Sequence, residues 1–466
     1  MAKVGIQRGL RSAVLARTVV GGLLLLSGGA PAHADIYELT PRDDWFSVLQ
    51  GEGLQPGDEV ILAAGEYRDA RRLVIGHRGT AERPVVIRAA DGATAILRRP
   101  DERQNSIDIQ GAQFLVLRGL EITGGSTGIR LSKSERHPCR FVTLENLHIH
   151  HVGGPAITAN HGGNAYEGLV FRRNHIHHTS GHAEGFYLGV NNADDGSTAG
   201  YIFNSRIEGN YIHDITGPQV LQGDGIEIKD GSYNNVVCDN VIHDTNYPGI
   251  IVYGTDGKAP NVIERNAIWN AGDHGIQAAA EAVIRNNVIW NSRGDGIYSR
   301  AHQSARVGNL QIVHNTVLGG PSGGAALRLA LDDQEPPQGP VLIANNAFFA
   351  AEGGVALRLP AAAAAQGRIT LAGNVGRGAA EGLPASASLQ LWNPRGELAR
   401  DLDDHRFPRA GSALLGAADA RFGVADDFNR TPRGNRRDVG AFVFDERGNP
   451  GWTPQPGFKE LPPAQR

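Results

Sequence analysis

The 466-residue sequence contains only two cysteines, no block of basic residues and, after its first 34 residues, no long apolar run. The missing apolar run excludes a membrane-spanning helix from the rest of the chain, because a span needs roughly 20 apolar residues. The missing basic block, with a formal net charge of −4, argues against a general nucleic-acid-binding protein. An acidic polymer remains a suitable partner, since its binding needs only a local basic groove.

Residues 1–34 have the pattern of an export signal. Lys3, Arg8 and Arg11 precede an apolar run over residues 19–26 that is too short to span a membrane. Ala32-His33-Ala34 offers a small-x-small cleavage site, so we expect a mature chain that begins at Asp35 and is periplasmic or secreted. Removing the four basic residues of this segment leaves 41 basic and 49 acidic residues, a formal charge of about −8.

The dominant feature of the mature sequence is a short phrase, Asn-x-Ile/Val or a close variant, that recurs every 21 to 36 residues. Its copies begin at Asn174, Asn210, Asn240, Asn266, Asn287, Asn315 and Asn346. Each copy follows a short apolar segment and precedes a second phrase such as Gly225-Ile or Gly249-Ile. Three short period-two strands per repeat, with the variable step absorbed by loops, are typical of a parallel β-helix. An α-solenoid is disfavoured, because the segments are short and rich in Val, Ile, Asn and Gly.

We therefore predict an all-β protein, a right-handed parallel β-helix with three strands per coil and a cap at each end. Residues 35–384 are assigned to the β-helix and its N-terminal cap, and residues 385–466 to a C-terminal cap with a flexible Pro-rich end. The recurring Asn predicts a ladder of stacked side chains at a tight turn, where Asn tolerates left-handed φ.

The two cysteines, Cys139 and Cys238, fall about three coils apart in this register. At ~4.8 Å per coil their separation is roughly 14 Å, which is too far for a disulfide. We expect two buried thiols.

Strand alternation identifies a polar strip on one sheet. In Gly225-Ile-Glu-Ile-Lys229 the isoleucines point inward, so Glu227 and Lys229 point outward. The equivalent outward positions of other coils include Arg130, Asn160, Tyr187, Tyr253, Tyr298, Arg300 and Arg328. Long loops surround the strip, at residues 191–200 and at residues 302–306. Rings and cations along a groove suit an extended polysaccharide that carries carboxylates.

A second column, His177, His213 and His243, belongs to another strand and continues as Trp269, Trp290 and Leu318. This apolar continuation favours side-chain stacking over a metal-binding or acid–base role. His182 is different, because it precedes the Tyr187 strand and is a candidate acid–base group at the edge of the polar strip.

The stretch Glu227-Ile-Lys229-Asp230, followed by Asn234-Asn235, resembles the active-site strand of the chondroitinase B-like alginate lyases, which are right-handed parallel β-helix polysaccharide lyases. In that family the next coil carries Arg-His-Gly, where this sequence has Val252-Tyr253-Gly254. The resemblance covers most of the mature chain at the level of pattern. It implies β-elimination on an acidic polysaccharide such as alginate.

Elimination from a uronate polymer requires a base for the C5 proton, a positive charge for the resulting enolate and an acid for the departing O4. We assign Lys229 as the base and Tyr253 as the acid or an alternative base. Arg300, or a Ca²⁺ ion held by Glu227, Asp194 and Asp195, would neutralise the carboxylate. The predicted polymer-binding residues are Tyr187, Asn160, Tyr298, Arg130 and Arg328.

Three other functions fit the same features. A uronan C5-epimerase shares the proton abstraction, although the sequence lacks the Asp-Pro-His-Asp phrase of alginate epimerases. A hydrolase would use a pair of carboxylates drawn from Asp194, Asp195 and Asp224. A non-catalytic exopolysaccharide-binding protein needs only the polar strip, with Lys229 simply ion-paired to Glu227 or Asp230. In each case the expected partner is an acidic polysaccharide and the expected state is a monomer.

Overall fold

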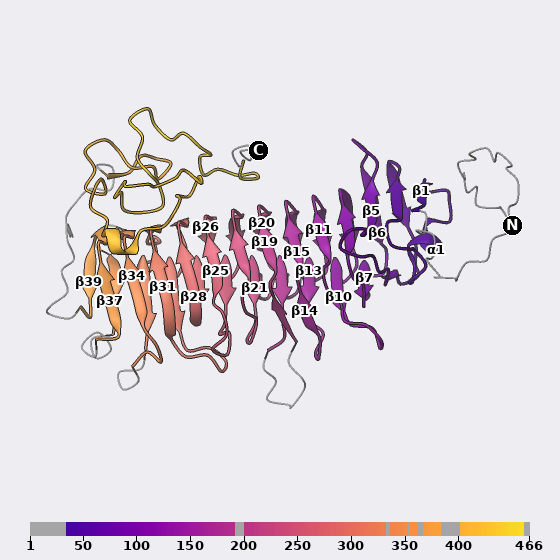
Figure 1. Ribbon diagram of the computed structural model, residues 1–466, viewed down its shortest axis with the longest axis horizontal. Coiled ribbons are helices and arrows are strands. Elements are labelled where there is room, and N and C mark those ends of the chain that lie inside the picture. The colour runs from indigo at the N-terminus through magenta and orange to yellow at the C-terminus, as the bar shows by residue number, and fades with distance from the viewer. Residues whose placement is uncertain are drawn as a thin grey trace, which may run out of the picture.

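The computed structural model describes residues 34–191, 200–331, 336–351, 354–360, 367–383 and 401–460. These residues form a long parallel β-helix whose coils stack along the long axis of the molecule (Figure 1). Apart from Ala34, the predicted export signal lies outside the described residues, as do Asp194 and Asp195. Within the described part of the chain, no helix has the length and apolar character needed to span a membrane.

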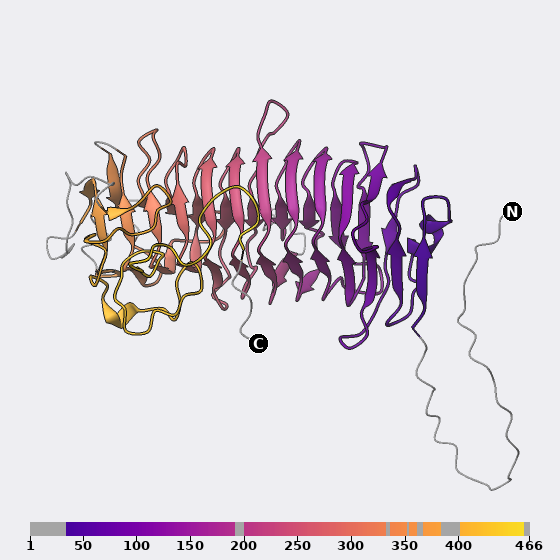
Figure 2. The ribbon, with the colours of Figure 1, turned by 90° about the horizontal axis from the view of Figure 1, so that it is seen from above.

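Three sheets, here named A, B and C, run along the β-helix, and from β2 onward the chain visits them in the order A, C, B. Figure 2 shows their strands stacked along the long axis. Sheet A consists of β1 (Ile36–Leu39), β2 (Glu59–Leu62), β5 (Val85–Ala89), β8 (Leu115–Arg118), β11 (Thr143–Glu145), β15 (Val170–Arg172), β19 (Arg206–Glu208), β22 (Val236–Cys238), β25 (Asn261–Glu264), β28 (Ala280–Arg285), β31 (Gly308–Val313), β34 (Val341–Ala344) and β37 (Ile369–Ala372).

Sheet B consists of β4 (Val74–Ile75), β7 (Ile107–Gln110), β10 (Ile129–Ser132), β13 (Ile157–Ala159), β17 (Phe186–Leu188), β21 (Ile226–Ile228), β24 (Ile250–Val252), β27 (Ile276–Ala278), β30 (Ile297–Arg300), β33 (Leu327–Ala330), β36 (Val355–Arg358) and β39 (Ala379–Glu381). Sheet C consists of β3 (Gly65–Arg68), β6 (Ala95–Arg99), β9 (Leu120–Gly124), β12 (His148–Val152), β16 (His175–Thr179), β20 (Tyr211–Ile215), β23 (Val241–Thr245), β26 (Ala267–Ala271), β29 (Val288–Trp290), β32 (Thr316–Leu318), β35 (Ala347–Phe349) and β38 (Val375–Arg377). A small extra pair, β14 (Ala165–Glu167) and β18 (Tyr201–Phe203), lies beside the main sheets.

Inward side chains of the three sheets form one continuous core. In sheet B, Ile226, Ile250, Ile276 and Ile297 pair directly from coil to coil, and all four are fully buried. Burying an isoleucine side chain contributes on the order of 2 kcal/mol. Because these strands are parallel and in register, an isoleucine at the same position of each coil gives an unbroken apolar column. This explains why the repeat preserves its isoleucines.

The predicted asparagine ladder is confirmed. From Asn210 onward, each ladder Asn accepts hydrogen bonds at Oδ1 from the backbone N and the Nδ2 of the Asn one coil earlier. The distances are 2.9 to 3.0 Å for Asn240 to Asn266 and 3.0 Å for Asn266 to Asn287. The prediction of left-handed φ at these residues was wrong. The left-handed residue is the one before, such as Asp239 and Arg265 with φ of 58° and 57°. The turn bends there, and this leaves the Asn side chain pointing inward along the stack.

The two ends of the chain pack against the β-helix in different ways. At the N-terminus, α1 (Trp45–Leu49) places Trp45, Phe46 and Leu49 against the first coils, and Asp44 caps it by accepting from Ser47 N. The C-terminal residues 401–460, which include the 3₁₀ helix η1 (Ala420–Phe422), turn back along the outside of sheet C (Figure 1).

This C-terminal segment is packed rather than loose. Its Phe428 and Phe442 form an apolar cluster with Trp269 of β26. Lys459 is buried, and its Nζ donates to Asp239 Oδ1 at 2.9 Å and to Phe428 O at 2.6 Å. The prediction of a flexible end was therefore wrong as far as residue 460.

Both cysteines are buried and free, as predicted. Burial raises the pKa of the Cys139 and Cys238 thiols to about 12. Neither thiol is therefore a nucleophile at neutral pH.

Replacing a ladder residue should destabilise the whole β-helix. Asn266→Ala removes the acceptor for Asn240 and the donor to Val237 O at 2.9 Å, and so leaves several buried polar groups unpaired. We expect the free energy of unfolding to fall by about 3 kcal/mol in urea titrations followed by circular dichroism. The control Gln311→Ala removes an exposed amide from β31 and should change it by less than about 0.5 kcal/mol. Equal effects of the two substitutions would contradict a stabilising ladder.

Candidate functional site

The outward positions of sheet B form two adjoining columns, as the alternation predicted. The pairing of strands β10 to β36 places one column in register as Arg130, Thr158, Tyr187, Glu227, Ile251, Gln277, Tyr298, Arg328 and Arg358. Two residues further along these strands, Lys229, Tyr253 and Arg300 belong to the second column. The middle coils hold the densest cluster of ionisable groups on this face.

Glu227, Lys229 and Tyr253 form a closed hydrogen-bonded triad. The Lys229 ammonium forms an ion pair with Glu227 Oε1 and donates to the Tyr253 hydroxyl at 3.2 Å. The Tyr253 hydroxyl donates to the same Glu227 Oε1 at 2.8 Å. The Lys229 Nζ also lies 4.6 Å from the ring centroid of Tyr187. All three members of the triad are buried, so their charges interact with little screening by water.

The environment fixes the protonation of the triad. Burial acts to lower the pKa of the Lys229 ammonium, but the Glu227 carboxylate and Tyr187 more than offset it, and the pKa lies above its ordinary value. Burial and the neighbouring Glu227 raise the pKa of the Tyr253 phenol. Lys229 is thus a cation and Tyr253 a neutral proton donor at neutral pH.

Two further carboxylates lie beside Glu227. Ligand atoms of Glu184, Asp224 and Glu227 lie within 4.8 Å of one another, and all three residues are buried. Both carboxylate oxygens of Glu184, Oδ1 of Asp224 and Oε2 of Glu227 have no hydrogen-bond partner among the described residues. Burial raises the pKa of Glu184 to about 7 and that of Asp224 well above its usual range. Orphaned, converging carboxylate oxygens are the donors that a hard cation such as Ca²⁺ prefers.

A histidine from a later coil completes the cluster. The turn after β30 returns toward the triad, because Asp230 Oδ2 accepts hydrogen bonds from Ser304 N at 3.3 Å and Ser304 Oγ at 3.2 Å. The His302 ring stacks on Tyr253 with ring centroids 4.5 Å apart and an interplanar angle of 19°. Burial, Arg300 and Lys229 together lower the pKa of His302 to about 4, so its imidazole is neutral.

His302 was missed by the sequence reasoning. The repeat assigns outward positions only within strands, and His302 lies in a loop whose path depends on the Asp230 contacts. Glu184 and Asp224 were not predicted as metal ligands for a similar reason, because each precedes the glycine that starts its sheet B strand.

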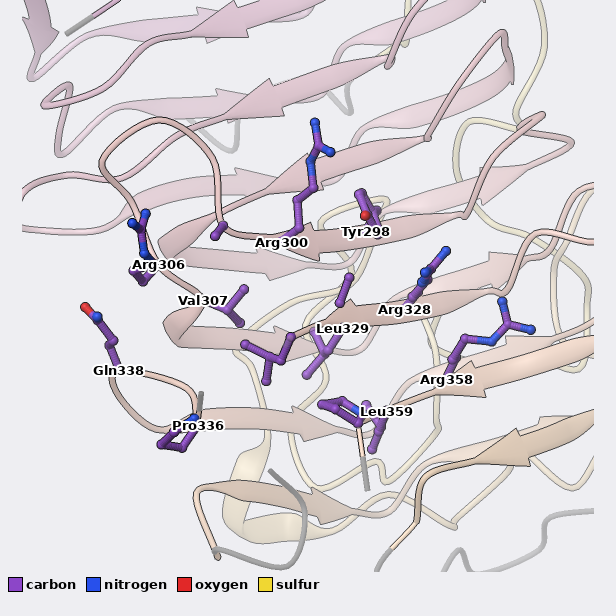
Figure 3. A pocket seen from close by; sticks show the side chains of 14 residues that line it. Tyr298, Arg300, Arg306, Val307, Arg328, Leu329, Pro336, Gln338, Arg358 and Leu359 are labelled. Carbon is purple, nitrogen blue, oxygen red and sulfur yellow. The ribbon is translucent and has the colours of Figure 1, made fainter. Parts of the chain in front are cut away.

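A basic groove continues from the cluster toward the C-terminus. A cavity of about 510 Å³ is lined by Tyr298, Arg300, Arg306, Arg328 and Arg358, together with apolar residues (Figure 3). The Arg328 guanidinium lies 5.6 Å from the Tyr298 ring centroid, and Arg358 is ion-paired with Glu381 at 2.6 Å. Figure 3 shows Tyr298, Arg300, Arg328 and Arg358 projecting from the strands that line this groove. The groove offers several guanidinium groups in a row.

The remaining predicted site residues lie apart from the triad. Ala279 lies between Tyr253 and Arg300 in their column, so Arg300 is roughly 10 Å from Tyr253 at ~4.8 Å per coil. Arg130 and Asn160 lie on the N-terminal side of Tyr187. His182 is exposed at the edge, with its Nδ1 3.9 Å from Glu184 Oε1.

Comparison with known proteins agrees with this architecture. A family model described as a right-handed β-helix region matches residues 105–260 and 255–330. The chain is similar to XylC, solved in complex with xylose, at 9% identity over 87% of this chain and 98% of XylC, with a TM-score of 0.62. The fold is a right-handed parallel β-helix. The chain is also similar to the pectate lyase Pel9A, at 14% identity over 88% of this chain and 96% of the lyase, with a TM-score of 0.51.

An alginate lyase from Paenibacillus sp. str. FPU-7 aligns at 19% identity over 72% of this chain and 97% of the lyase, with a TM-score of 0.43. No curated protein matches the sequence significantly. At these identities XylC and Pel9A show the fold alone, and the function is argued from the site itself.

The buried carboxylates predict a pH-dependent stability in the presence of a chelator. The pKa of Glu184 is raised from 4.5 to about 7 in the folded chain, so the neutral carboxyl favours the folded state below pH 4.5 and this contribution is lost as the pH rises through 7. The shift corresponds to roughly 3 kcal/mol. Denaturant unfolding of wild type and Glu184→Gln, measured with EDTA from pH 4.5 to 8, should show a weaker loss of stability in the variant. Parallel curves would contradict a neutral buried Glu184.

Proposed function

We propose that this protein is a polysaccharide lyase that cleaves a uronate-containing polymer such as alginate by β-elimination. The observation that carries the proposal is the buried Glu227, Lys229 and Tyr253 triad, with His302 stacked on it, at the end of an arginine-lined groove. This combination supplies a proton acceptor, a proton donor and a fixed positive charge in one place.

The groove supports an acidic substrate. Tyr298 of β30, Arg328 of β33 and Arg358 of β36 occupy one column of adjacent coils, which are spaced ~4.8 Å apart. Guanidinium groups form two-pronged hydrogen bonds with carboxylates, and aromatic rings stack on sugar faces. The overall chain is acidic, whereas this groove is lined by Arg300, Arg306, Arg328 and Arg358.

The triad supports a division of roles that differs from the sequence-based assignment of Lys229 as the base. Lys229 remains an ammonium, and its charge suits the substrate C6 carboxylate and the enolate that forms from it. His302, a neutral imidazole, takes the C5 proton, and the bound carboxylate raises its pKa toward neutrality. The Tyr253 phenol donates its proton to the departing O4. The C5–H and C4–O4 bonds break, and a C4=C5 double bond forms at the new non-reducing end.

A calcium ion is proposed at Glu184, Asp224 and Glu227, whose unpaired buried oxygens fit a hard cation. When bound, the ion supplies positive charge that offsets the three carboxylates and the charge of the substrate. Glu227 belongs both to this set of ligands and to the set predicted from the sequence. The other two ligands predicted from the sequence, Asp194 and Asp195, lie outside the described residues.

The place of action is proposed to be the periplasm or the extracellular space. The support is the sequence of residues 1–34, in which basic residues, a short apolar run and a small-x-small motif follow one another.

The test of function is the ultraviolet absorbance of unsaturated uronates, followed during incubation of the mature protein with alginates, pectates, glucuronans and glycosaminoglycans, with and without Ca²⁺. A lyase gives rising absorbance and shorter chains with the responding polymer. Altered sugars at constant chain length, seen by NMR, would instead identify an epimerase. Binding without chemical change would identify a scaffold.

Substitutions separate the proposed roles. Lys229→Ala and His302→Asn should each lower kcat/KM about 100-fold or more, whereas Lys229→Arg keeps the positive charge and should retain part of the activity. The kcat/KM of the wild type should fall as the pH drops through the His302 pKa of about 4, because the base must be unprotonated. Lys258→Ala, which alters a partly exposed loop lysine, is the matched control. If Lys229→Arg is as inactive as Lys229→Ala and activity needs alkaline pH, Lys229 is the base.

A further inference from the structure

The outside of sheet C carries a second cluster of ionisable groups. It lies on a different face of the β-helix from the triad, which belongs to sheet B. The stacking predicted for its histidine column is confirmed. The ring centroids of His177 and His213 lie 5.1 Å apart, and those of His243 and Trp269 lie 4.4 Å apart, with near-parallel planes. Trp269 and Trp290 continue the stack.

Stacking alone does not explain how the ring nitrogens of β12, β16 and β20 are arranged. His148 Nε2 and His177 Nε2 are hydrogen-bonded to each other at 2.8 Å, and His175 Nε2 and His213 Nε2 are hydrogen-bonded at 2.7 Å. Ligand atoms of His148, His175 and His177 all lie within 4.8 Å of one another. The two tryptophans further along the same column stack in the same way without any such convergence of polar atoms.

A carboxylate adjoins His148, one of the three imidazoles, and the neighbouring His150. Glu121 Oε1 lies 3.2 Å from His150 Nε2, and Glu121 Oε2 lies 3.8 Å from His148 Nδ1. Glu121, His148 and His150 form a second set of ligand atoms within 4.8 Å of one another, and it shares His148 with the first set. The cluster therefore combines several imidazole nitrogens with one carboxylate, all carried by consecutive strands of one sheet.

We propose that His148, His175 and His177 bind a first-row transition-metal ion of the class that prefers imidazole ligands, with Zn²⁺ as the reference ion and Glu121 beside it. Zn²⁺ takes imidazole nitrogens at about 2.0 to 2.1 Å in tetrahedral sites. Two such nitrogens are separated by roughly 3.4 Å, so the facing pair needs to open by well under 1 Å. Imidazole also suits Cu²⁺ and Ni²⁺, whereas Ca²⁺ prefers the oxygen donors on sheet B.

The site is open to solvent. The side chain of His148 is 37% exposed. A cleft of about 650 Å³ runs beside the cluster and is lined by His151 and His178, whose rings contact those of His150 and His177. On the C-terminal side, Phe458 lies 6.2 Å from His175 between ring centroids and borders the cluster. A bound ion would link strands β12 and β16 from outside.

The experiment uses the mature chain without a histidine tag, stripped with EDTA and titrated with Zn²⁺ by calorimetry. We expect about one equivalent to bind with a Kd of micromolar or lower, and the melting temperature to rise with Zn²⁺ concentration. The double variant His148→Phe/His177→Phe keeps aromatic rings in the stack but removes two ligands, and it should bind about 100-fold more weakly. His405→Phe, at an exposed histidine of the C-terminal segment, should bind like the wild type.

Two further measurements keep the test decisive. Co²⁺ added to the stripped wild type should give the intense visible absorption bands of a tetrahedral site, a readout that needs no variant. If the double variant fails to fold, the single variant His148→Gln replaces it. The proposal is overturned if the wild type binds neither ion at one equivalent, or if the folded ligand variants bind as tightly as the wild type. Neither result depends on lyase activity.

Discussion

The parallel hydrogen-bonded register between successive coils is the constraint on which the structure depends. It fixes a spacing of ~4.8 Å and aligns each residue with its equivalent one coil away. The asparagine ladder reinforces this alignment inside the turns, since each amide binds both the backbone and the side chain of its neighbour. Every functional column described above, acidic, basic or imidazole, is a direct result of this alignment.

The same constraint makes the sheet B cluster electrostatically demanding. Glu184, Asp224 and Glu227 are held together by the backbone, and the Lys229 ammonium forms an ion pair with one of them, Glu227. Burying unpaired carboxylates costs free energy, which appears as raised pKa values for Glu184 and Asp224. The apolar core and the asparagine ladder stabilise the fold enough to offset the free-energy cost of burying these carboxylates. A site held under such strain is typical of binding and catalysis rather than of structure.

The sequence was informative wherever the repeat applied. The Asn phrases and the alternation at Gly225-Ile-Glu-Ile-Lys229 were enough to predict the fold, the buried face and the outward columns, because period and register are local properties repeated many times. Loops carry no such information. The loop that brings His302 to Tyr253 is held by the contacts of Ser304 with Asp230, and the path of residues 401–460 along sheet C depends on an apolar surface assembled from several coils. The prediction placed the left-handed φ at Asn240, whereas the structure has it at Asp239, one residue earlier. Both Asp and Asn are common in turns, so the residue types alone do not distinguish the two positions.

The buried anchor at Lys459 has a consequence for how the chain assembles. Its ammonium binds Asp239 and the carbonyl of Arg265, residues that precede it by 220 and 194 positions. Coils can add to one another in sequence order, each using the previous one as a template, but the returning segment has no docking surface until the coils of β23 and β26 exist. The segment therefore docks only after those coils have formed, and it ties the C-terminal end of the chain to the middle coils. Local unfolding from the C-terminal end would first require the contacts of Lys459 to break. These contacts therefore couple the unfolding of distant coils, so the array of repeats behaves more cooperatively.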